Sequence, residues 1–397
     1  MGPSDASADQ TSPIRLGLIQ LTVPHYRVPV FDRLAADCRL HLTVLADTLQ
    51  ADGSLTSAAD RGHFRTEQTP WRRRGGFIVQ PGMLAAARSG RFDVLLLPWN
   101  TRILHLFPAL REARRRGVGT ILFGHGYSKK EGWLRRRLRN AALSRADAAV
   151  LYNHTAKTRL LEEGIAESKL HVALNALDQA PIQAAREAWR SQPAQLNAFR
   201  RQHGLVGREL ILFVSRLEPD KRVDLLIEAF ARVRSSHPEA RLAIVGDGSL
   251  RRSLEALAQD HGLGDAALFP GAIFDESELA PWMLCASAFA YPVAIGLSIL
   301  HAFGYGVPVV TSDDFASHNP EIEALRPGAN GLLYRENDVA DFAAKLELML
   351  IGGAWWESMS RAARDTVVGP DGFSLERMVR GMTEAVLAVA RRGPEAR

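Results

Sequence analysis

The sequence has little cysteine and no long apolar run. Its 397 residues include two cysteines, Cys38 and Cys285, which are too few for a disulfide framework. No apolar stretch approaches the roughly 20 residues that span a bilayer. The N-terminal segment MGPSDASADQTSP also lacks the basic and apolar regions of a secretory signal. We therefore expect a cytoplasmic protein with reduced thiols, and we interpret residues 1–13 as a disordered lead-in.

Charge is divided unequally along the chain. The net charge is +5, but residues 1–200 carry 29 Lys and Arg against 17 Asp and Glu, whereas residues 201–397 carry 20 against 27. Such an asymmetry predicts two domains with different partners. A basic half could bind nucleic acid on charge alone. No recognition motif accompanies the charge, so we expect no nucleic-acid partner.

Apolar runs of strand length recur through both halves, separated by helix-length amphipathic segments. They lie at 15–22, 41–46, 76–80, 93–99, 119–124, 148–153 and 170–174, and again at 210–215, 241–245, 267–269, 288–292 and 307–311. Strands that alternate with helices predict parallel sheets and an α/β fold. The stretch between the two series has no such run. We therefore predict two Rossmann-like, doubly wound domains, at 14–180 and 209–372, joined by a linker at 181–208 and facing each other across a ligand-binding cleft.

The segment FVSRLEPDK at 213–221 carries the strongest chemical signal. A strand ends at Ser215, and Arg216 and Lys221 follow in a loop that enters a helix. Two cations beside a helix N-terminus at the carboxyl end of a strand suit a diphosphate. The alternative is a solvated loop with ordinary surface charges, and this segment alone leaves it open.

A second signal lies in YPVAIGLSILHAFGYGVPVV at 291–310. A strand ends near Pro292, and a turn of small residues at 294–298 opens a helix that Gly306 closes. The amides at the start of this helix form a phosphate-accepting arrangement, and Gly296 lets a ligand approach the backbone. The alternative is a plain strand–turn–helix with glycines for packing.

The ordered combination of these segments resembles glycosyltransferase family 4, whose members are retaining enzymes of the GT-B fold. The resemblance covers roughly 210–350 and rests on SRLEPDK, VGDG at 245–248, LFPGAI at 268–273, the 291–310 segment and PGANGLLY at 327–334. It implies a GT-B pair of domains and a nucleotide-sugar donor. It also implies that the C-terminal helix, within 373–397, crosses back to the first domain.

The resemblance assigns roles to residues of the second domain. Arg216 and Lys221 would hold the donor diphosphate, and the backbone at Ala272 and Ile273 would meet the nucleobase. The amides of Gly296, Leu297 and Ser298 would contact phosphate. Family members usually carry a Glu-x7-Glu signature, whose acids contact the donor sugar and the ribose, but Val293 and His301 stand at these positions. We expect His301 to hydrogen-bond the ribose through a ring nitrogen, with a structural histidine as the alternative.

Another segment, SHNPEIE at 317–323, follows the strand predicted at 307–311. His318 or Glu321 would reach the donor if this loop faces the cleft. The alternative for Glu321 is an acid favoured by the dipole at a helix N-terminus. Asn175 resembles a residue of the family's interdomain turn, and we interpret it as a hinge residue.

The acceptor side is expected in the first domain. By resemblance, His125 in GHGYS at 124–128 would face the donor sugar and is the main catalytic candidate there, together with Arg216 and Lys221 in the second domain. His25 and Arg27, which follow the first strand, are acceptor-side candidates. So is Asn100, with Arg102, after the strand predicted at 93–99.

Basic residues cluster at 72–74, at 114–116 and in KKEGWLRRRLRNAAL at 129–143. The last segment predicts a basic amphipathic helix with Trp133, Leu134 and Leu138 among its cations. Such a helix can lie on an anionic membrane, which suits a lipid-linked acceptor and a peripheral location on the inner face. A solvated helix with a core-facing leucine stripe is the alternative.

These observations predict a retaining glycosyltransferase that moves a hexose from a UDP- or GDP-sugar to a hydroxyl acceptor, in cell-surface polysaccharide or glycolipid synthesis. We expect no cofactor and no metal, because the sequence has no His/Cys cluster and the Asp313–Asp314 pair lacks further ligands. Two alternatives stay open at this point. One is a sugar-nucleotide epimerase of the same fold, and the other is a catalytically silent partner subunit that binds nucleotide sugars.

Overall fold

A computed structural model describes residues 12–48, 57–127, 132–205 and 209–392. The chain divides into two compact units, one made of residues 1–173 and 378–397, and the other of residues 174–377. The disordered lead-in predicted at 1–13 lies almost entirely outside the described residues. No helix in the described ranges has the length and apolar character needed to cross a membrane.

The first unit is built on a seven-stranded parallel sheet with the strand order β3-β2-β1-β6-β7-β8-β9. These strands are β1 (Ile14–Ile19), β2 (Leu40–Ala46), β3 (Arg65–Gln68), β6 (Val94–Pro98), β7 (Gly119–Gly124), β8 (Ala148–Leu151) and β9 (Leu170–Val172). The central strands are buried on both faces, as their continuous apolar runs predict.

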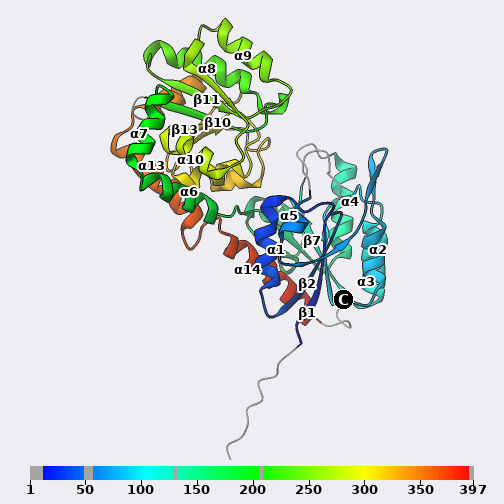
Figure 1. Cartoon of the computed structure of the whole chain (residues 1–397). Coiled ribbons are helices and arrows are strands. Elements are labelled where there is room, and N and C mark those ends of the chain that lie inside the picture. Colours follow the sequence, from blue (N-terminus) through cyan, green and yellow to red (C-terminus); the bar gives the residue numbers. More distant parts are fainter. Residues whose placement is uncertain (1–11, 49–56, 128–131, 206–208, 393–397) are drawn as a thin grey trace, which may run out of the picture. The chain divides into compact units, whose positions relative to one another are not determined.

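Helices cover both faces of this sheet, as Figure 1 shows for α2 and α3 on one side and α1 and α14 on the other. The helices are α1 (Val28–Ala35), α2 (Pro81–Arg88), α3 (Leu106–Arg115), α4 (Trp133–Arg145), α5 (His154–Glu162) and α14 (Leu375–Arg391). Apolar side chains of α2, α3, α4 and α5 share one core cluster with the sheet. Burial of this apolar area stabilises the unit.

The second unit holds a six-stranded parallel sheet with the order β12-β11-β10-β13-β14-β15. Its strands are β10 (Leu210–Val214), β11 (Arg241–Val245), β12 (Ala267–Gly271), β13 (Ala286–Tyr291), β14 (Val309–Ser312) and β15 (Gly331–Tyr334). Its helices are α6 (Ala180–Arg190), α7 (Pro193–Gln202), α8 (Val223–Ser236), α9 (Arg251–Asp260), α10 (Glu276–Cys285), α11 (Ser298–Tyr305), α12 (Val339–Leu350) and α13 (Gly353–Val368).

Three features differ from the sequence-based expectation. The run at 76–80 does not join the seven-stranded sheet. It forms β5 (Phe77–Val79), which pairs in an antiparallel hairpin with β4 (Arg72–Arg74). The edge strands β3 and β15 were not predicted. The stretch 181–208 is not a linker, because α6 and α7 pack within the second unit, where the Trp189 indole donates to the Ser277 carbonyl.

Helix α14 begins in the second unit and joins the first unit from Met378 onward. Its apolar face is fully buried through Met378, Met382, Val386 and Val389. The Thr383 hydroxyl lies 3.4 Å from the Asp37 carboxylate, just beyond α1. The sheet of the first unit is therefore covered by the last helix of the chain.

In the second unit, the loops after β10 and β11 approach each other closely at VGDG. Gly246 has φ of +151°, and a Cβ atom there would lie 1.8 Å from the Ser215 carbonyl oxygen. The Leu217 amide donates to the Asp247 carbonyl at 2.9 Å, which joins the two loops. Only glycine fits this position, because any side chain would push the Ser215 backbone away.

We expect Gly246→Ala to lower the stability of the second unit by about 4 kcal/mol, through backbone strain and the clash with Ser215. Thermal unfolding measures the loss. Gly328→Ala is the matched control, since φ there is +79° but no atom lies within 4 Å of a new Cβ. It should cost only the conformational strain, about 1 kcal/mol. Equal losses in the two variants would contradict the close-approach argument.

Candidate functional site

The predicted donor residues of the second unit lie at the carboxyl ends of its parallel strands. Arg216 and Lys221 follow β10, Ala272 and Ile273 follow β12, and the 294–298 turn follows β13. Strands β10 and β13 are direct neighbours in the sheet. The hydroxyl groups of Ser215 and Tyr291 lie 3.0 Å apart and join the ends of these two strands. The two predicted phosphate-binding segments therefore meet at one edge of the sheet.

The two cations after β10 differ in their surroundings. Arg216 is exposed and forms no ion pair with any residue that the structure describes. The Lys221 ammonium lies 2.9 Å from the Asp220 carboxylate, and the lysine side chain is 13% exposed. Burial of Asp220 opposes its ionisation, but the hydrogen bond and the charge of Lys221 hold the pKa of this carboxyl below its ordinary value. The guanidinium of Arg216 is exposed and available to a ligand, whereas the ammonium of Lys221 is paired with Asp220.

The loop that carries these cations is fixed by its neighbour after β11. The Glu218 carboxylate accepts hydrogen bonds from the Ser249 hydroxyl at 2.7 Å and from the Ser249 amide at 3.2 Å. These bonds hold the pKa of Glu218 below its ordinary value. The loop ends at Arg222, which has φ of +49° and donates to Asp224 and Asn337. The loop that carries Arg216 is thus held in place by the side chains of Glu218 and Arg222.

The turn after β13 is held by one buried histidine. The Ile295 amide donates to His318 Nδ1 at 3.1 Å, and His318 Nε2 lies 2.9 Å from the Ser312 carbonyl oxygen. Because Nδ1 accepts, the ring carries its proton on Nε2 and donates it to Ser312. Ala294, with φ of +58°, turns the Ile295 amide toward the ring. His318 is 1% exposed, so it supports the turn rather than touching a ligand.

Three consecutive amides are open at the start of α11. Within the described ranges, no residue accepts a hydrogen bond from the backbone N–H of Gly296, Leu297 or Ser298. All three residues are half-buried. Gly296 is required for a reason that the sequence did not indicate, since a Cβ there would lie 2.8 Å from the Asn319 amide nitrogen. The positive end of the helix dipole adds to these donors, so the turn can bind an anion.

His301, the expected ribose contact, pairs with an acid from another helix. Its Nε2 lies 2.8 Å from Glu276 Oε1, which also accepts from the Tyr305 hydroxyl at 2.6 Å. Burial opposes ionisation of Glu276, but the hydrogen bond and charge of His301 hold its pKa below the ordinary value. Burial and this carboxylate raise the pKa of Tyr305. Glu276 was not predicted, because nothing in the sequence links it to a residue 25 positions away.

The predicted nucleobase loop lies between β12 and α10. Ala272 is exposed and Ile273 is half-buried. Phe274, which follows them, is 96% exposed. Asp275 then caps α10, its carboxylate accepting from the Ser277 amide at 2.7 Å. The loop therefore presents backbone and apolar groups at the same sheet edge as the phosphate turn.

Two other residues of the second unit, Asn175, which we interpreted as a hinge residue, and Glu321, pair with each other. The Asn175 side-chain amide donates to the Glu321 carboxylate, and both residues are buried. Glu321 lies in a short 3₁₀ turn, Pro320–Ala324, with its carboxylate against Asn175. The pair fixes the chain that leads into α6. Glu321 is an acid in the first turn of its helix, as the alternative interpretation has it, and its carboxylate is turned to Asn175.

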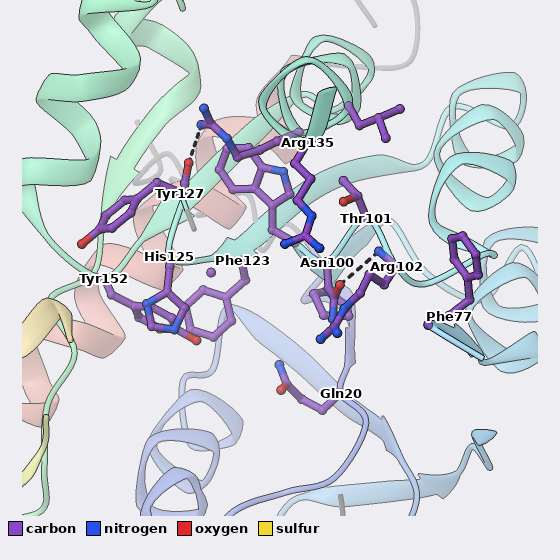
Figure 2. A pocket seen from close by; sticks show the side chains of 17 residues that line it. Gln20, Phe77, Asn100, Thr101, Arg102, Phe123, His125, Tyr127, Arg135 and Tyr152 are labelled. Atoms are coloured by element: carbon purple, nitrogen blue, oxygen red, sulfur yellow. Dashed lines mark hydrogen bonds between the residues drawn. The ribbon is translucent and has the colours of Figure 1, made fainter. Parts of the chain in front are cut away.

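The first unit has a cavity of about 790 Å³ at the carboxyl ends of its strands. Figure 2 shows its labelled side chains, which come from β5, from the end of β7, from the loops after β1, β6, β7 and β8, and from α4. Its wall is formed by Gln20, Gly76, Phe77, Pro98, Trp99, Asn100, Thr101, Arg102, Phe123, Gly124, His125, Gly126, Tyr127, Arg135, Leu138, Arg139 and Tyr152. His125 and Asn100 were predicted as site residues, and both line this cavity.

His125 is exposed at the mouth of the loop after β7. Its ring packs edge-to-face on Tyr152, with the ring centroids 5.0 Å apart. Gly126 and the buried Arg139 fix the loop, because the Arg139 guanidinium donates to the Gly126 carbonyl and pairs with Glu163 at 2.8 Å. His125 therefore presents its imidazole from a rigid support.

Arg27 and His25 do not line the cavity. Arg27 is 6% exposed, with its guanidinium carbon 4.9 Å from the Tyr152 ring centroid and 5.5 Å from that of Phe123. It also reaches Met378 Sδ at 3.4 Å. Arg27 is thus a packing cation beneath the loop rather than the open acceptor contact that we expected. Desolvation and the charge of Arg61 lower the pKa of His25, which favours its neutral form.

Helix α4 carries most of the basic segment expected at 129–143, of which residues 129–131 lie outside the described ranges. Leu143 and Ala142 face the core, but Trp133, Leu134 and Leu138 are 70%, 53% and 41% exposed. The alternative of a leucine stripe packed in the core therefore does not hold for Leu134 and Leu138. No group of three or more His, Cys, Asp or Glu side chains that could hold a metal occurs among the described residues.

Residues 197–366 match a protein family described as glycosyl transferases group 1. The chain is 34% identical over 180 residues to the exopolysaccharide phosphotransferase SCO2592 of Streptomyces coelicolor, across 43% of this chain and 19% of that protein. It is 29% identical over 213 residues to a GDP-mannose-dependent alpha-(1-6)-phosphatidylinositol monomannoside mannosyltransferase of Mycolicibacterium smegmatis, across 50% of this chain and 53% of that protein. The chain spans about a fifth and about half of these two relatives.

A solved structure of HepE from Anabaena, in complex with UDP, has the same fold. The TM-score is 0.73 at 17% identity, and the match covers 94% of this chain and 100% of that one. The likeness confirms the predicted GT-B fold with its two Rossmann-like sheets. The resemblance to glycosyltransferases drawn from the sequence is confirmed at the level of the group 1 family.

We expect His318→Ala to destabilise the second unit by about 3 kcal/mol, because it leaves the Ile295 amide and the Ser312 carbonyl without their buried partner. Thermal unfolding measures this loss, and equilibrium dialysis with UDP and GDP measures nucleotide binding by the loosened turn. His261→Ala is the matched control, since His261 is exposed at the end of α9. A His318 variant as stable as the control would refute the supporting role.

We expect the stability contributed by Glu276 to depend on pH. Its folded pKa is depressed, so the contribution is complete above the ordinary value of 4.5 and is lost as the pH falls through the folded pKa. Glu276→Gln should therefore be about 1 kcal/mol less stable than the natural chain at pH 7, and the difference should vanish in strong acid. The loss is confined to the pH range in which Glu276 takes up a proton.

Denaturant unfolding at a series of pH values measures this difference. Glu278→Gln on the same helix is the control, because the Glu278 carboxylate is exposed and makes no hydrogen bond with a described residue. Its effect should be small and constant. A pH-independent difference for Glu276→Gln would contradict the pair.

Proposed function

We propose, from the premise that residues 197–366 form a glycosyl transferases group 1 domain, that the chain is a glycosyltransferase. It moves a hexose from a UDP- or GDP-sugar to a hydroxyl acceptor with retention of anomeric configuration. The observation that carries this proposal is the meeting of an open guanidinium, Arg216, with the three unoccupied amides of residues 296–298 at one sheet edge. A cation and a helix N-terminus together are suited to a diphosphate.

The nucleoside fits beside this diphosphate site. The nucleobase loop, Ala272 and Ile273, ends three residues before Glu276, and the phosphate turn begins α11 three residues before His301. The Glu276–His301 pair joins these two segments. In a nucleotide the ribose lies between base and phosphate, so this pair is placed to bind the ribose hydroxyls. It supplies from α10 the carboxylate that is missing at position 301.

Charge stabilisation of the leaving group drives the reaction. The acceptor hydroxyl forms a bond to the anomeric carbon as the bond from that carbon to the diphosphate oxygen breaks. The hydroxyl proton passes to the donor phosphate, and the nucleoside diphosphate leaves on the same face. Arg216, Lys221 and the amides of 296–298 stabilise the charge that develops on it. We propose that no metal and no cofactor takes part.

The acceptor binds in the first unit, near His125. Exopolysaccharide and phosphatidylinositol mannoside synthesis appear in the names of the two relatives, which supports a role in cell-surface polysaccharide or glycolipid assembly. The exposed Trp133 and Leu134, beside the arginines of α4, support peripheral contact with an anionic membrane surface. We propose a cytoplasmic location at that surface.

Arg216→Ala and Lys221→Ala should each lower turnover of the nucleotide sugar by at least about 100-fold, because each removes a charge from the leaving-group site. A thermal-shift screen with UDP, GDP and dTDP first identifies the nucleotide, since ligand binding raises the unfolding temperature. Transfer to acceptor and slow donor hydrolysis are then followed by release of the nucleoside diphosphate.

Arg252→Ala is the matched control, because Arg252 is exposed on α9 and should leave turnover unchanged. Folded Arg216 and Lys221 variants with normal turnover would refute the donor site. Conversion of the donor to a new sugar nucleotide without acceptor would identify an epimerase instead. A folded natural chain that binds nucleotide but neither transfers nor hydrolyses the sugar would identify a silent subunit.

A further inference from the structure

The charged side chains that line the cavity of the first unit are all basic. Its 17 lining residues include three arginines and one histidine, and none is Asp or Glu. A cavity with polar groups of one sign selects ligands of the opposite sign. The lining therefore favours an anionic ligand over a neutral sugar.

Two of the three arginines are available to such a ligand. Arg139 is neutralised by Glu163 at 2.8 Å. In the part of the chain that the structure describes, no acid, carbonyl or ring partners the guanidinium of Arg102 or Arg135, and both residues are exposed. Two unneutralised guanidinium groups that line one cavity attract an anionic ligand.

Both side chains are carried on ordered backbone. The Asn100 side-chain oxygen accepts from the Arg102 amide at 3.1 Å and shapes the loop after β6. Arg135 lies in the first turn of α4, and Figure 2 shows its side chain reaching into the cavity toward the loop of Asn100, Thr101 and Arg102. The two guanidinium groups therefore enter the cavity from different elements.

The start of α4 gives an independent reason for an anion. Arg135 lies in the first turn of α4, near the positive end of the helix dipole, and this turn contains no acid. A cation at this end of a helix is unfavourable. A bound anion would relieve both the dipole and the guanidinium charges.

The rest of the wall suits a saccharide. Trp99, Tyr127 and Tyr152 offer aromatic faces, and the side-chain amides of Gln20 and Asn100 offer hydrogen bonds. Convergent polar groups set among aromatic rings are typical of small-molecule sites. His125 stands on the same wall.

We propose that this cavity binds the acceptor as a phosphate-bearing saccharide, with the phosphate held between Arg102 and Arg135 and the sugar against the aromatic wall. That the bound saccharide is the acceptor rests on the proposed function, whereas the existence of an anion site in the cavity does not. Arg102 and Arg135 are then the residues that determine which acceptors the enzyme accepts. The phosphate comes either from a soluble sugar phosphate or from a lipid-linked one.

Isothermal titration of the full chain with glucose 6-phosphate and with glucose tests the proposal. Glucose 6-phosphate should bind at least tenfold more tightly than glucose. Arg102→Gln and Arg135→Gln should each remove at least tenfold of that affinity, because each deletes a charge-assisted hydrogen bond to phosphate. Arg136→Gln is the matched control from the same helix and should bind like the natural chain. Equal binding of the two sugars, or unchanged binding by both variants, would overturn the proposal.

The same titration with the double variant Arg216→Ala/Lys221→Ala separates this site from the donor site. Charge-dependent binding of glucose 6-phosphate should persist there, even if the donor assays fail and the proposed function falls. Loss of that binding in the double variant would place the phosphate at the donor site and overturn the acceptor proposal.

Competition identifies the source of the phosphate. Farnesyl phosphate and farnesol are each added to the complex with glucose 6-phosphate. Displacement by farnesyl phosphate alone indicates a lipid-linked acceptor, which Leu138 on the cavity wall would accommodate. Displacement by neither compound indicates a soluble sugar phosphate. Equal displacement by both would show that the apolar chain, not the phosphate, is recognised, and would overturn the proposal.

Discussion

Where parallel strands end, their peptide groups lose the partners of the sheet ladder, and other groups must satisfy them. At the carboxyl edge of the second sheet, side chains form hydrogen bonds with these backbone groups. His318 bonds both the Ile295 amide and the Ser312 carbonyl, the Tyr334 hydroxyl donates to the Pro292 carbonyl at 2.8 Å, and the Thr311 hydroxyl donates to the Tyr291 carbonyl at 2.7 Å. With the neighbouring backbone tied down in this way, the three amides at 296–298 have no acceptor among the described residues and are open to a ligand.

The sequence predicted the frame of the fold well, because continuous apolar runs report burial directly. Strands such as β7 and β11 begin and end where their runs do. The prediction of elements from the sequence failed where their side chains are only slightly buried. The edge strand β3 reads RTEQ and has no apolar pattern, and α6 and α7 looked like a linker because their contacts are with distant residues. Apolar periodicity cannot reveal an element that packs by one side or pairs at an edge.

The candidate site shows the same division. Local signals placed Arg216 and the 296–298 amides correctly at a sheet edge, because the strand–loop–helix order alone determines where they lie. The partners of single side chains could not be predicted. His301 meets Glu276, and Arg27 packs among aromatic rings against Met378, through contacts that only the folded chain creates. A charged residue near a strand end therefore indicates where a candidate site lies. It does not indicate whether the charged side chain is available to a ligand or is paired with another residue.

The last helix has a consequence for synthesis. A ribosome delivers the strands of the first sheet early, but Met378, Met382, Val386 and Val389, which cover that sheet, emerge after the whole second unit. The second unit, residues 174–377, is contiguous and can close by itself as soon as it is made. The first unit is thus translated first but completed last. The apolar face of its sheet that α14 covers stays exposed while about two hundred residues of the second unit are translated.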